Sequence, residues 1–141
     1  MTRVDFYLLD GKPATSPDLA ACRLAAKAFL LGHKIFIRTR DAGQAQTLDR
    51  LLWTFSAGSF VPHALDSEMT DPRTSVIIGS GEPPSGLSDV LINLDVDVPN
   101  AFSRFQRVAE IVAPEESAKV QARDRFRFYR DRGYQLETHH L

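Results

Sequence analysis

Cysteine is nearly absent from this sequence, since Cys22 is the single one among 141 residues. One cysteine cannot form an internal disulfide, so the fold depends on its hydrophobic core, and the chain fits a reducing compartment. Cys22 lies in the middle of an apolar, helix-like segment. A thiol in such a place is buried and unreactive rather than nucleophilic. The sequence therefore excludes a disulfide-stabilised scaffold and gives no support to a catalytic cysteine.

Long hydrophobic runs are also missing. The apolar run near the N-terminus is too short for a signal peptide, and no segment approaches membrane-spanning length. The net charge of −1 excludes the overall basic field that drives non-specific nucleic-acid binding. A hydrophobic content of 43% and a charged content of 25% are ordinary for a soluble domain. We expect a cytoplasmic protein of one domain, covering residues 1–141, with no membrane partner.

Nucleotide-binding motifs are missing too. No Walker-type phosphate loop occurs, and the first predicted strand is followed only by an Asp-Gly-Lys-Pro turn at residues 10–13. A Gly-Ser-Gly sequence at residues 79–81 follows a later predicted strand. It continues with an acid and two prolines, which suit neither a phosphate nor the start of a helix. The segment is better explained as a flexible surface loop, so the sequence predicts no nucleotide site.

Catalytic and metal-binding patterns are equally sparse. The four histidines are not spaced as metal ligands, and no Cys-x-x-Cys pair exists. His33 follows a predicted helix end, where capping explains it. His139 and His140 lie within the last three residues, where we expect disorder. We therefore predict a protein that is not an enzyme by itself and has no catalytic residues, cofactor or metal.

The elements that the patterns do predict alternate between strands and helices. Apolar or alternating runs predict strands at residues 4–9, 34–38, 74–79, 89–94 and 107–112. Helices are predicted over residues 19–31 after a Ser16 cap, from Asp41 through Leu52, over residues 99–105, and from Pro114 to about residue 132. Strands separated by helices indicate an α/β fold with a mostly parallel sheet flanked by helices.

The last predicted helix carries the most informative pattern of the chain. At about 100° per residue, one narrow strip of its surface collects four cations and an aromatic ring: Lys119, Arg123, Phe126, Arg127 and Arg130. Like charges at this spacing repel each other, and the acids Asp124 and Asp131 lie off the strip. The strip is therefore typical of a surface that binds an anionic partner with an apolar end.

A second feature is the aromatic segment at residues 51–63. Trp53, Phe55 and Phe60 occur within eight residues around Gly58, where a helix end and a loop are expected. These rings either fill the core where the helix returns to the sheet or stay exposed as anchors for a partner. The sequence leaves both readings open.

These features together resemble the chi subunit family of bacterial DNA polymerase III. The similarity runs through the whole chain, at residues 5–9, 48–53, 59–63, 90–94, 117–130 and 133–136. Its most specific part is Trp53, the Ser-Phe-Val-Pro-His sequence of residues 59–63 and the last helix. The resemblance implies a Rossmann-like fold without a nucleotide-binding loop. It also implies a non-catalytic clamp-loader-associated subunit in DNA replication.

The resemblance also implies partners. Chi subunits bind the acidic C-terminal tail of single-stranded DNA-binding protein (SSB), which ends in a phenylalanine carboxylate. Through the psi subunit they connect this contact to the clamp loader, so DNA is met mainly indirectly. Carried over by position, the tail-binding residues are Lys119, Arg123, Phe126 and Arg127, with Arg130 beside them. Phe126 stands where the family usually has tyrosine, and Arg127 where lysine is common; both substitutions keep the chemistry.

The residues that face psi, or another clamp-loader subunit where psi is absent, fall on Trp53, Phe60, Val61 and Pro62. Two alternatives to the tail-binding function stay open. The basic helix could bind single-stranded nucleic acid directly, with Phe126 and Tyr129 stacking on bases. A small α/β enzyme using the loop of residues 79–86 is the other, and the sequence gives it no support.

Overall fold

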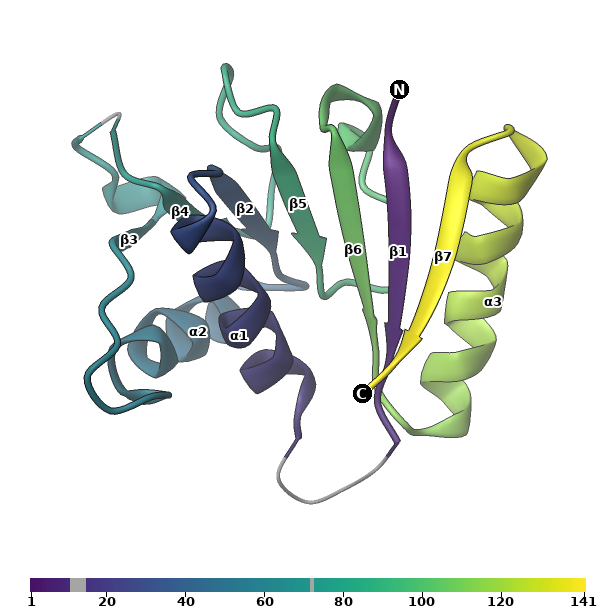
Figure 1. Cartoon of the computed structure of the whole chain (residues 1–141), viewed down its shortest axis with the longest axis horizontal. Helices are drawn as coiled ribbons and strands as arrows, with labels where there is room; N and C mark the ends of the chain where they lie inside the picture. The colour runs from purple at the N-terminus through teal and green to yellow at the C-terminus, as the bar shows by residue number, and fades with distance from the viewer. Residues whose placement is uncertain (11–14, 72) are drawn as a thin grey trace.

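The chain forms one open sheet with helices on both faces (Figure 1). The computed structural model describes residues 1–10, 15–71 and 73–141. Within these residues the sheet has seven strands, all parallel, in the order β3-β4-β2-β5-β6-β1-β7. The strands are β1 (Arg3–Leu8), β2 (Ile35–Arg38), β3 (His63–Leu65), β4 (Val76–Gly79), β5 (Val90–Asn93), β6 (Arg107–Val112) and β7 (Gln135–His140). The helices are α1 (Pro17–Leu30), α2 (Ala42–Thr54) and α3 (Glu116–Asp131).

The predicted α/β fold is confirmed, and two predicted helix starts are confirmed to the residue. The Ser16 hydroxyl accepts a hydrogen bond from the Leu19 amide at 3.1 Å, and the Asp41 carboxylate accepts one from the Gln44 amide at 2.8 Å. Side-chain acceptors at these positions satisfy amides that have no partner inside the helix. The helix predicted over residues 99–105 is wrong, because only a single 3₁₀ turn forms, at Phe102–Arg104. The turn predicted at residues 10–13 falls largely outside the described residues.

The two faces of the sheet bury separate cores. One core packs α1 and α2 against the sheet and contains Ile37, Leu48 and Ile92. It also holds Cys22, which is fully buried, and burial raises the pKa of its thiol to about 12. The expected burial of this cysteine is therefore confirmed. The second core lies on the other face, where α3 packs Ala122 and Tyr129 against the sheet.

The C-terminal strand corrects an expectation. Residues 139–140 are not disordered: they belong to β7, which pairs along the whole length of β1. The His139 ring stacks on Tyr7 with centroids 4.7 Å apart, and its Nε2 lies 2.9 Å from the carboxylate of Asp5. Arg3 donates to Glu137 at 2.8 Å. These contacts join residues more than 130 positions apart. Local sequence patterns therefore cannot predict them.

Asp5 is the centre of this attachment. It is 1% exposed, and it accepts hydrogen bonds from Arg107 at 2.9 Å and from Arg3 at 3.2 Å. Burial alone would raise the pKa of this carboxyl, but the hydrogen bonds from His139 and Arg107 and the charges of Arg107 and Arg3 hold the pKa below its ordinary 3.8. A carboxyl with a lowered folded-state pKa stabilises the fold above its unfolded-state pKa.

We therefore expect Asp5→Asn to lower the free energy of unfolding by about 1–3 kcal/mol at pH 5, because three donors lose a charged acceptor. The difference from the wild type should shrink as the pH falls from 5 toward 2, since the wild-type carboxylate is itself protonated there. Urea unfolding followed by circular dichroism at several pH values measures both quantities. A difference that does not change with pH below 4 would contradict this assignment.

Candidate functional site

The helix α3 crosses the face of the sheet that the other two helices leave open. It begins after Pro114 and ends where Gly133 adopts φ of +81°, a conformation that favours glycine. The Tyr134 amide then donates to the Tyr129 carbonyl at 3.2 Å. This cap reverses the chain directly into β7, so that α3 and β7 form one continuous unit at the edge of the sheet (Figure 1).

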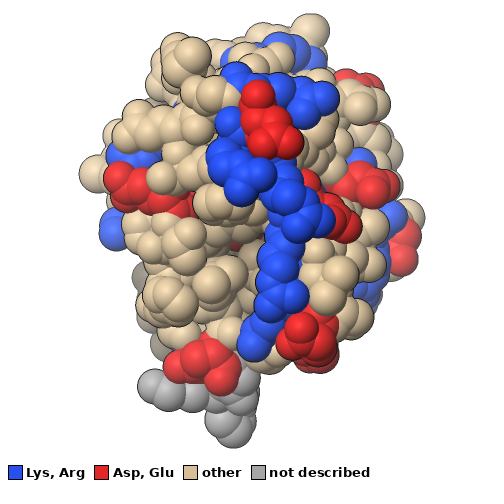
Figure 2. Space-filling view, turned by 90° about the vertical axis from the view of Figure 1, so that its right-hand side faces the viewer, with Lys and Arg blue, Asp and Glu red and all other residues tan. Residues whose placement is uncertain are grey.

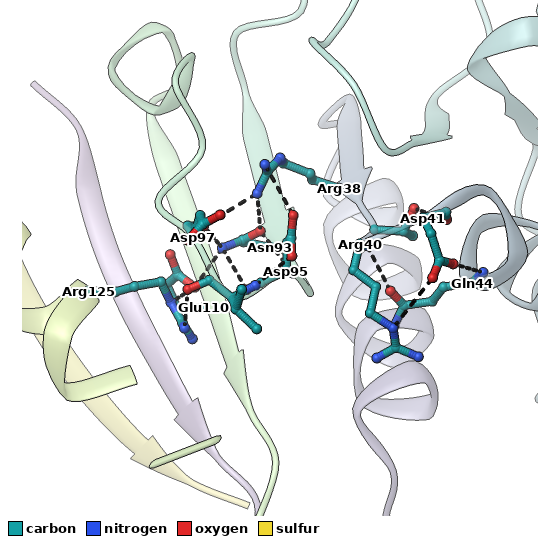
Figure 3. Close-up of polar contacts among 11 residues, drawn as sticks. Arg38, Arg40, Asp41, Gln44, Asn93, Asp95, Asp97, Glu110 and Arg125 are labelled. Carbon is teal, nitrogen blue, oxygen red and sulfur yellow. Dashed lines mark hydrogen bonds and ion pairs between the residues drawn. The ribbon is translucent and has the colours of Figure 1, made fainter. Parts of the chain in front are cut away.

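The buried side of α3 is fixed by a polar cluster that the sequence did not reveal. Glu110 of β6 is completely buried, and its carboxylate accepts from Arg125 Nε at 2.9 Å and from the Tyr129 hydroxyl at 2.7 Å. Asn93 donates to the same carboxylate at 2.9 Å, and Arg125 also donates to the Val96 carbonyl at 2.9 Å (Figure 3). Burial raises the pKa of Glu110, while the Arg125 charge and the three donors oppose the rise. The cluster therefore sets which side of α3 faces outward.

An acid inside an otherwise apolar strand is the signal that would have pointed to this cluster. Alternate residues of a strand share one face, so Glu110 lies on the same face of β6 as Val108 and Val112, which are buried in the core under α3. A buried acid needs a partner, and a helix with several arginines supplies one. Tyr129 is also fully buried, so the proposed stacking of Tyr129 on a nucleic-acid base is wrong.

The outward side of α3 carries the predicted strip. Lys119, Arg123, Arg127 and Arg130 are exposed, whereas Phe126 is half-buried. Figure 2 shows Lys and Arg side chains in a continuous column down this face of the molecule, with acidic side chains beside it. The acids lie closer than the helical projection suggested. The column's ion pairs are Arg123 with Glu116, Arg127 with Asp124, and Arg130 with Asp131. All three pairs are exposed, and such pairs contribute little, so a stronger anionic ligand can replace them.

A pocket opens beside the N-terminal half of this strip, between α3 and the sheet. It encloses about 200 Å³, and most of its wall is apolar: Phe6, Leu8, Leu9, Val112, Ala113, Ala122 and Phe126, with Thr138, Lys119 and Arg123 completing it. The Phe126 ring packs on Phe6, with centroids 5.4 Å apart. The structure thus brings Lys119, Arg123 and Phe126 together around one pocket. Arg127 and Arg130 lie further along the strip and do not line it.

The pocket residues outside α3 escaped the sequence reasoning. The sequence predicts Phe6 and Leu8 only as strand residues, and it gives no prediction for Thr138. Strand residues i, i+2 share one face of a sheet, so Phe6 and Leu8 can be assigned to one face together. The strand that α3 covers cannot be read from the sequence.

The aromatic segment lies near the other end of the sheet, where α2 runs toward β3 (Figure 1). Trp53 is 57% exposed and Phe60 is 64% exposed, and their ring centroids are 5.8 Å apart. His63 packs against Trp53 at 4.6 Å and is held by the carbonyls of Val61 and Asp49. The exposed reading is therefore correct for these two rings, whereas Phe55 is half-buried and packs against the core.

The two other residues of this segment that were predicted to face a partner differ in their exposure to solvent. Pro62 is half-buried, but Val61 is only 2% exposed, so its side chain belongs to the core and the expectation that it faces a partner is wrong. The sequence reasoning also missed Leu30, which is 82% exposed at the end of α1. Leu30 and Phe60 line one hollow of about 350 Å³. The position of a leucine at a helix end does not by itself predict that the side chain is exposed.

Known proteins similar to this chain share its full length. The model of the protein family described as "DNA polymerase III chi subunit, HolC" matches residues 1–137. This chain belongs to the chi subunit family. The DNA polymerase III subunit chi of Pseudomonas aeruginosa is 43% identical over 141 residues, which cover 100% of this chain and 98% of that protein. The subunit chi of Escherichia coli is 33% identical over 98% of this chain and 97% of its own length, and that of Haemophilus influenzae is 31% identical over 96% and 95%.

Membership in the chi family makes this chain a subunit of DNA polymerase III and places it in DNA replication. An accessory subunit of that polymerase fits a role without catalysis of its own. None of the helices in the described residues is long and apolar enough to cross a membrane. The functional question for this chi chain is therefore which of its surfaces meets which partner.

Proposed function

We propose that this chi subunit binds the acidic C-terminal tail of SSB in the pocket beside α3 and connects it to the clamp loader. The observation that carries the proposal is the apolar pocket with Lys119 and Arg123 on its wall. An apolar residue at the C-terminus of a chain combines an apolar side chain with a carboxylate. These are the two groups that an apolar pocket with cations on its wall can bind. A terminal phenylalanine would place its ring against Phe6, Leu8 and Phe126, and its carboxylate near the two cations.

The remaining cations of α3 would hold the acidic residues that precede the terminal phenylalanine. Arg127 and Arg130 extend the strip away from the pocket, and both are paired only with exposed acids of the same helix. Charged contacts on an exposed surface are weakened by salt. We therefore expect salt-sensitive binding of moderate strength, about micromolar, which corresponds to roughly −8 kcal/mol.

Direct binding of single-stranded DNA by α3 is less well supported. The outward strip of α3 carries four cations, Lys119, Arg123, Arg127 and Arg130, whereas a groove that follows a nucleic-acid backbone usually extends further. Stacking also requires accessible rings, and Tyr129 is buried while Phe126 faces the pocket. A titration with oligothymidylate that gave a steep salt dependence would favour this alternative.

The second half of the proposed function assigns the aromatic surface to the clamp loader. Trp53, Phe60 and Leu30 are large, apolar and more than half exposed, and adjacent rings of this kind are typical anchors of protein interfaces. Pro62 lies beside them in the chain. We propose that this surface binds psi, or another clamp-loader subunit where the host has no psi. Because the aromatic surface and α3 lie toward opposite ends of the sheet, both partners could bind at once.

A bridging experiment tests this proposal. An SSB-tail peptide is immobilised, the chi subunit is added, and the clamp-loader subunits are then passed over it. We expect the wild type to retain the clamp loader, and Trp53→Ser with Phe60→Ser to stay on the peptide but lose the clamp loader. The control variant is Arg50→Ser, an exposed position on α2. Retention of the clamp loader by the double variant would contradict the assignment of the aromatic surface.

A further inference from the structure

One half of the sheet is covered by a helix on only one side. In β1, Val4 and Phe6 point into the core under α3, so Asp5 and Tyr7 point to the opposite face. On that opposite face α1 lies over β2, β5 and part of β6, while β1 and β7 continue beyond it (Figure 1). The edge of α1 and the uncovered part of the sheet meet at an angle and leave a groove between them.

This groove, called here the α1 groove, encloses about 370 Å³. One wall is the stripe of α1 that repeats every three to four residues, namely Leu24, Lys27, Ala28 and Leu31. The floor comes from β5 and β6, with Val90, Ile92, Val108 and Ala109. The far side is formed by Tyr7, His139 and Leu141. Leu31 is 69% exposed and Leu141 is 44% exposed, so aliphatic surface remains open to an occupant on both sides of the groove.

Among the described side chains that line the α1 groove, the solvent-accessible charges are positive. Lys27 is exposed, and among the described residues it has no ion pair. The side chain of Arg107 is 49% exposed, and it donates to Asp5. Among the described residues, the acidic side chain that lines the groove is Asp5, which is 2% exposed and already accepts from Arg107, Arg3 and His139. A ligand in the groove would therefore contact Lys27 and Arg107, which can donate further hydrogen bonds. The Asp5 carboxylate is buried and already paired with cations.

The same neutralisation argues against a metal ion at this place. The ligand atoms of Asp5, Glu137 and His139 lie within 4.8 Å of one another. Arg3 donates to both carboxylates, at 3.2 Å and 2.8 Å, and Arg107 donates to Asp5. Two guanidinium groups beside these ligands would repel a cation. The cluster instead attaches β7 and leaves the groove with a basic rim.

We propose that the α1 groove is a docking site for an acidic segment of a protein partner that carries aliphatic or aromatic side chains. Charge complementarity selects the acidic residues, which would pair with Lys27 and Arg107. The aliphatic walls select the apolar side chains, which would pack against Leu24, Leu31 and Val90. A nucleic acid fits less well, because the walls are mainly aliphatic. The rings of Tyr7 and His139 are stacked on each other, so the faces that meet are not free to stack on a base. The groove does not include the pocket of α3 or the exposed rings Trp53 and Phe60, so this docking site does not depend on the proposed function.

A peptide titration followed by NMR tests the α1 groove. The probe is acetyl-Asp-Glu-Leu-Asp-Phe-Glu-amide, whose amidated end removes the terminal carboxylate that the pocket of α3 needs. It is titrated into the ¹⁵N-labelled full chain, beside a second peptide in which every acid is replaced by lysine. We expect the acidic peptide to shift amides of Lys27, Ala28, Leu31 and Ala109, and the basic peptide to leave them unchanged.

Variants then locate the binding. Lys27→Glu should weaken binding of the acidic peptide about tenfold, because an attraction becomes a repulsion, and Leu31→Ser should weaken it through lost apolar contact. Both positions are exposed, so the fold should persist, and Arg50→Glu is the control with the same charge change elsewhere. Equal shifts with both peptides, shifts confined to α3, or shifts of the groove amides by oligothymidylate and not by the acidic peptide would overturn the proposal.

Discussion

Replacing Arg125 with alanine should strongly destabilise this protein. The substitution leaves Glu110 completely buried without the guanidinium that faces it at 2.9 Å. Removing one partner of a buried ion pair costs about 3–5 kcal/mol, because the remaining charge is neither solvated nor paired. The Val96 carbonyl loses its donor in the same change. Urea unfolding of the wild type and of Arg125→Ala measures the loss directly.

Two comparison variants make this result specific. Arg127→Ala removes an exposed arginine of the same helix and should change the free energy of unfolding by less than about 0.5 kcal/mol. Combining Arg125→Met with Glu110→Met should recover part of the loss, since no unpaired charge is then buried. If Arg125→Ala were as stable as Arg127→Ala, the cluster would not be what fixes α3 on the sheet.

Replacing Arg123 with alanine should have the opposite profile, with a large effect on binding and almost none on stability. Arg123 lines the pocket, and its one ion pair, with Glu116 at 3.4 Å, is exposed. If Arg123 holds the terminal carboxylate of the SSB tail, its removal should cost about 2–5 kcal/mol of binding free energy. Fluorescence anisotropy with a labelled tail peptide gives the affinity, and circular dichroism verifies the fold.

Further variants separate the charge from the pocket. Thr138→Trp adds a large ring on β7 at the edge of the pocket, and it should abolish tail binding without changing any charge, whereas Thr138→Ser should not. Arg130→Ala removes a cation outside the pocket and should cost far less than Arg123→Ala. A folded Arg123→Ala variant that kept its affinity would contradict the site assignment.

The local parts of the fold could be predicted because their causes are local. Ser16 and Asp41 cap their helices through contacts three residues away, and the strip on α3 follows from helical periodicity alone. β7 could not be predicted, because its polar sequence is stabilised by Asp5, Tyr7 and Arg3 at the other end of the chain. The short helix expected near residue 100 reduces to one turn, since Phe102 and Phe105 instead pack into the core.

The candidate site divides in the same way. Lys119, Arg123 and Phe126 share a helix, so their spacing predicts their proximity. The pocket that these three residues line is also formed by Phe6 and Leu8, which come from the opposite end of the sequence. Trp53 and Phe60 could be recognised as candidate anchors, but only the packing of His63 and Val61 shows which side chains of that segment remain outside.

The most direct test of the central claim is a titration of this protein with an acidic peptide that ends in Asp-Ile-Pro-Phe. The peptide is used once with a free terminal carboxylate and once with an amide, each at low and high salt. We predict that the free-acid peptide binds and that salt weakens it. The amide should bind far more weakly, because Arg123 and Lys119 then lack their anion. Equal binding of the two peptides, or no binding of either, would contradict the proposal that the pocket beside α3 recognises the SSB tail.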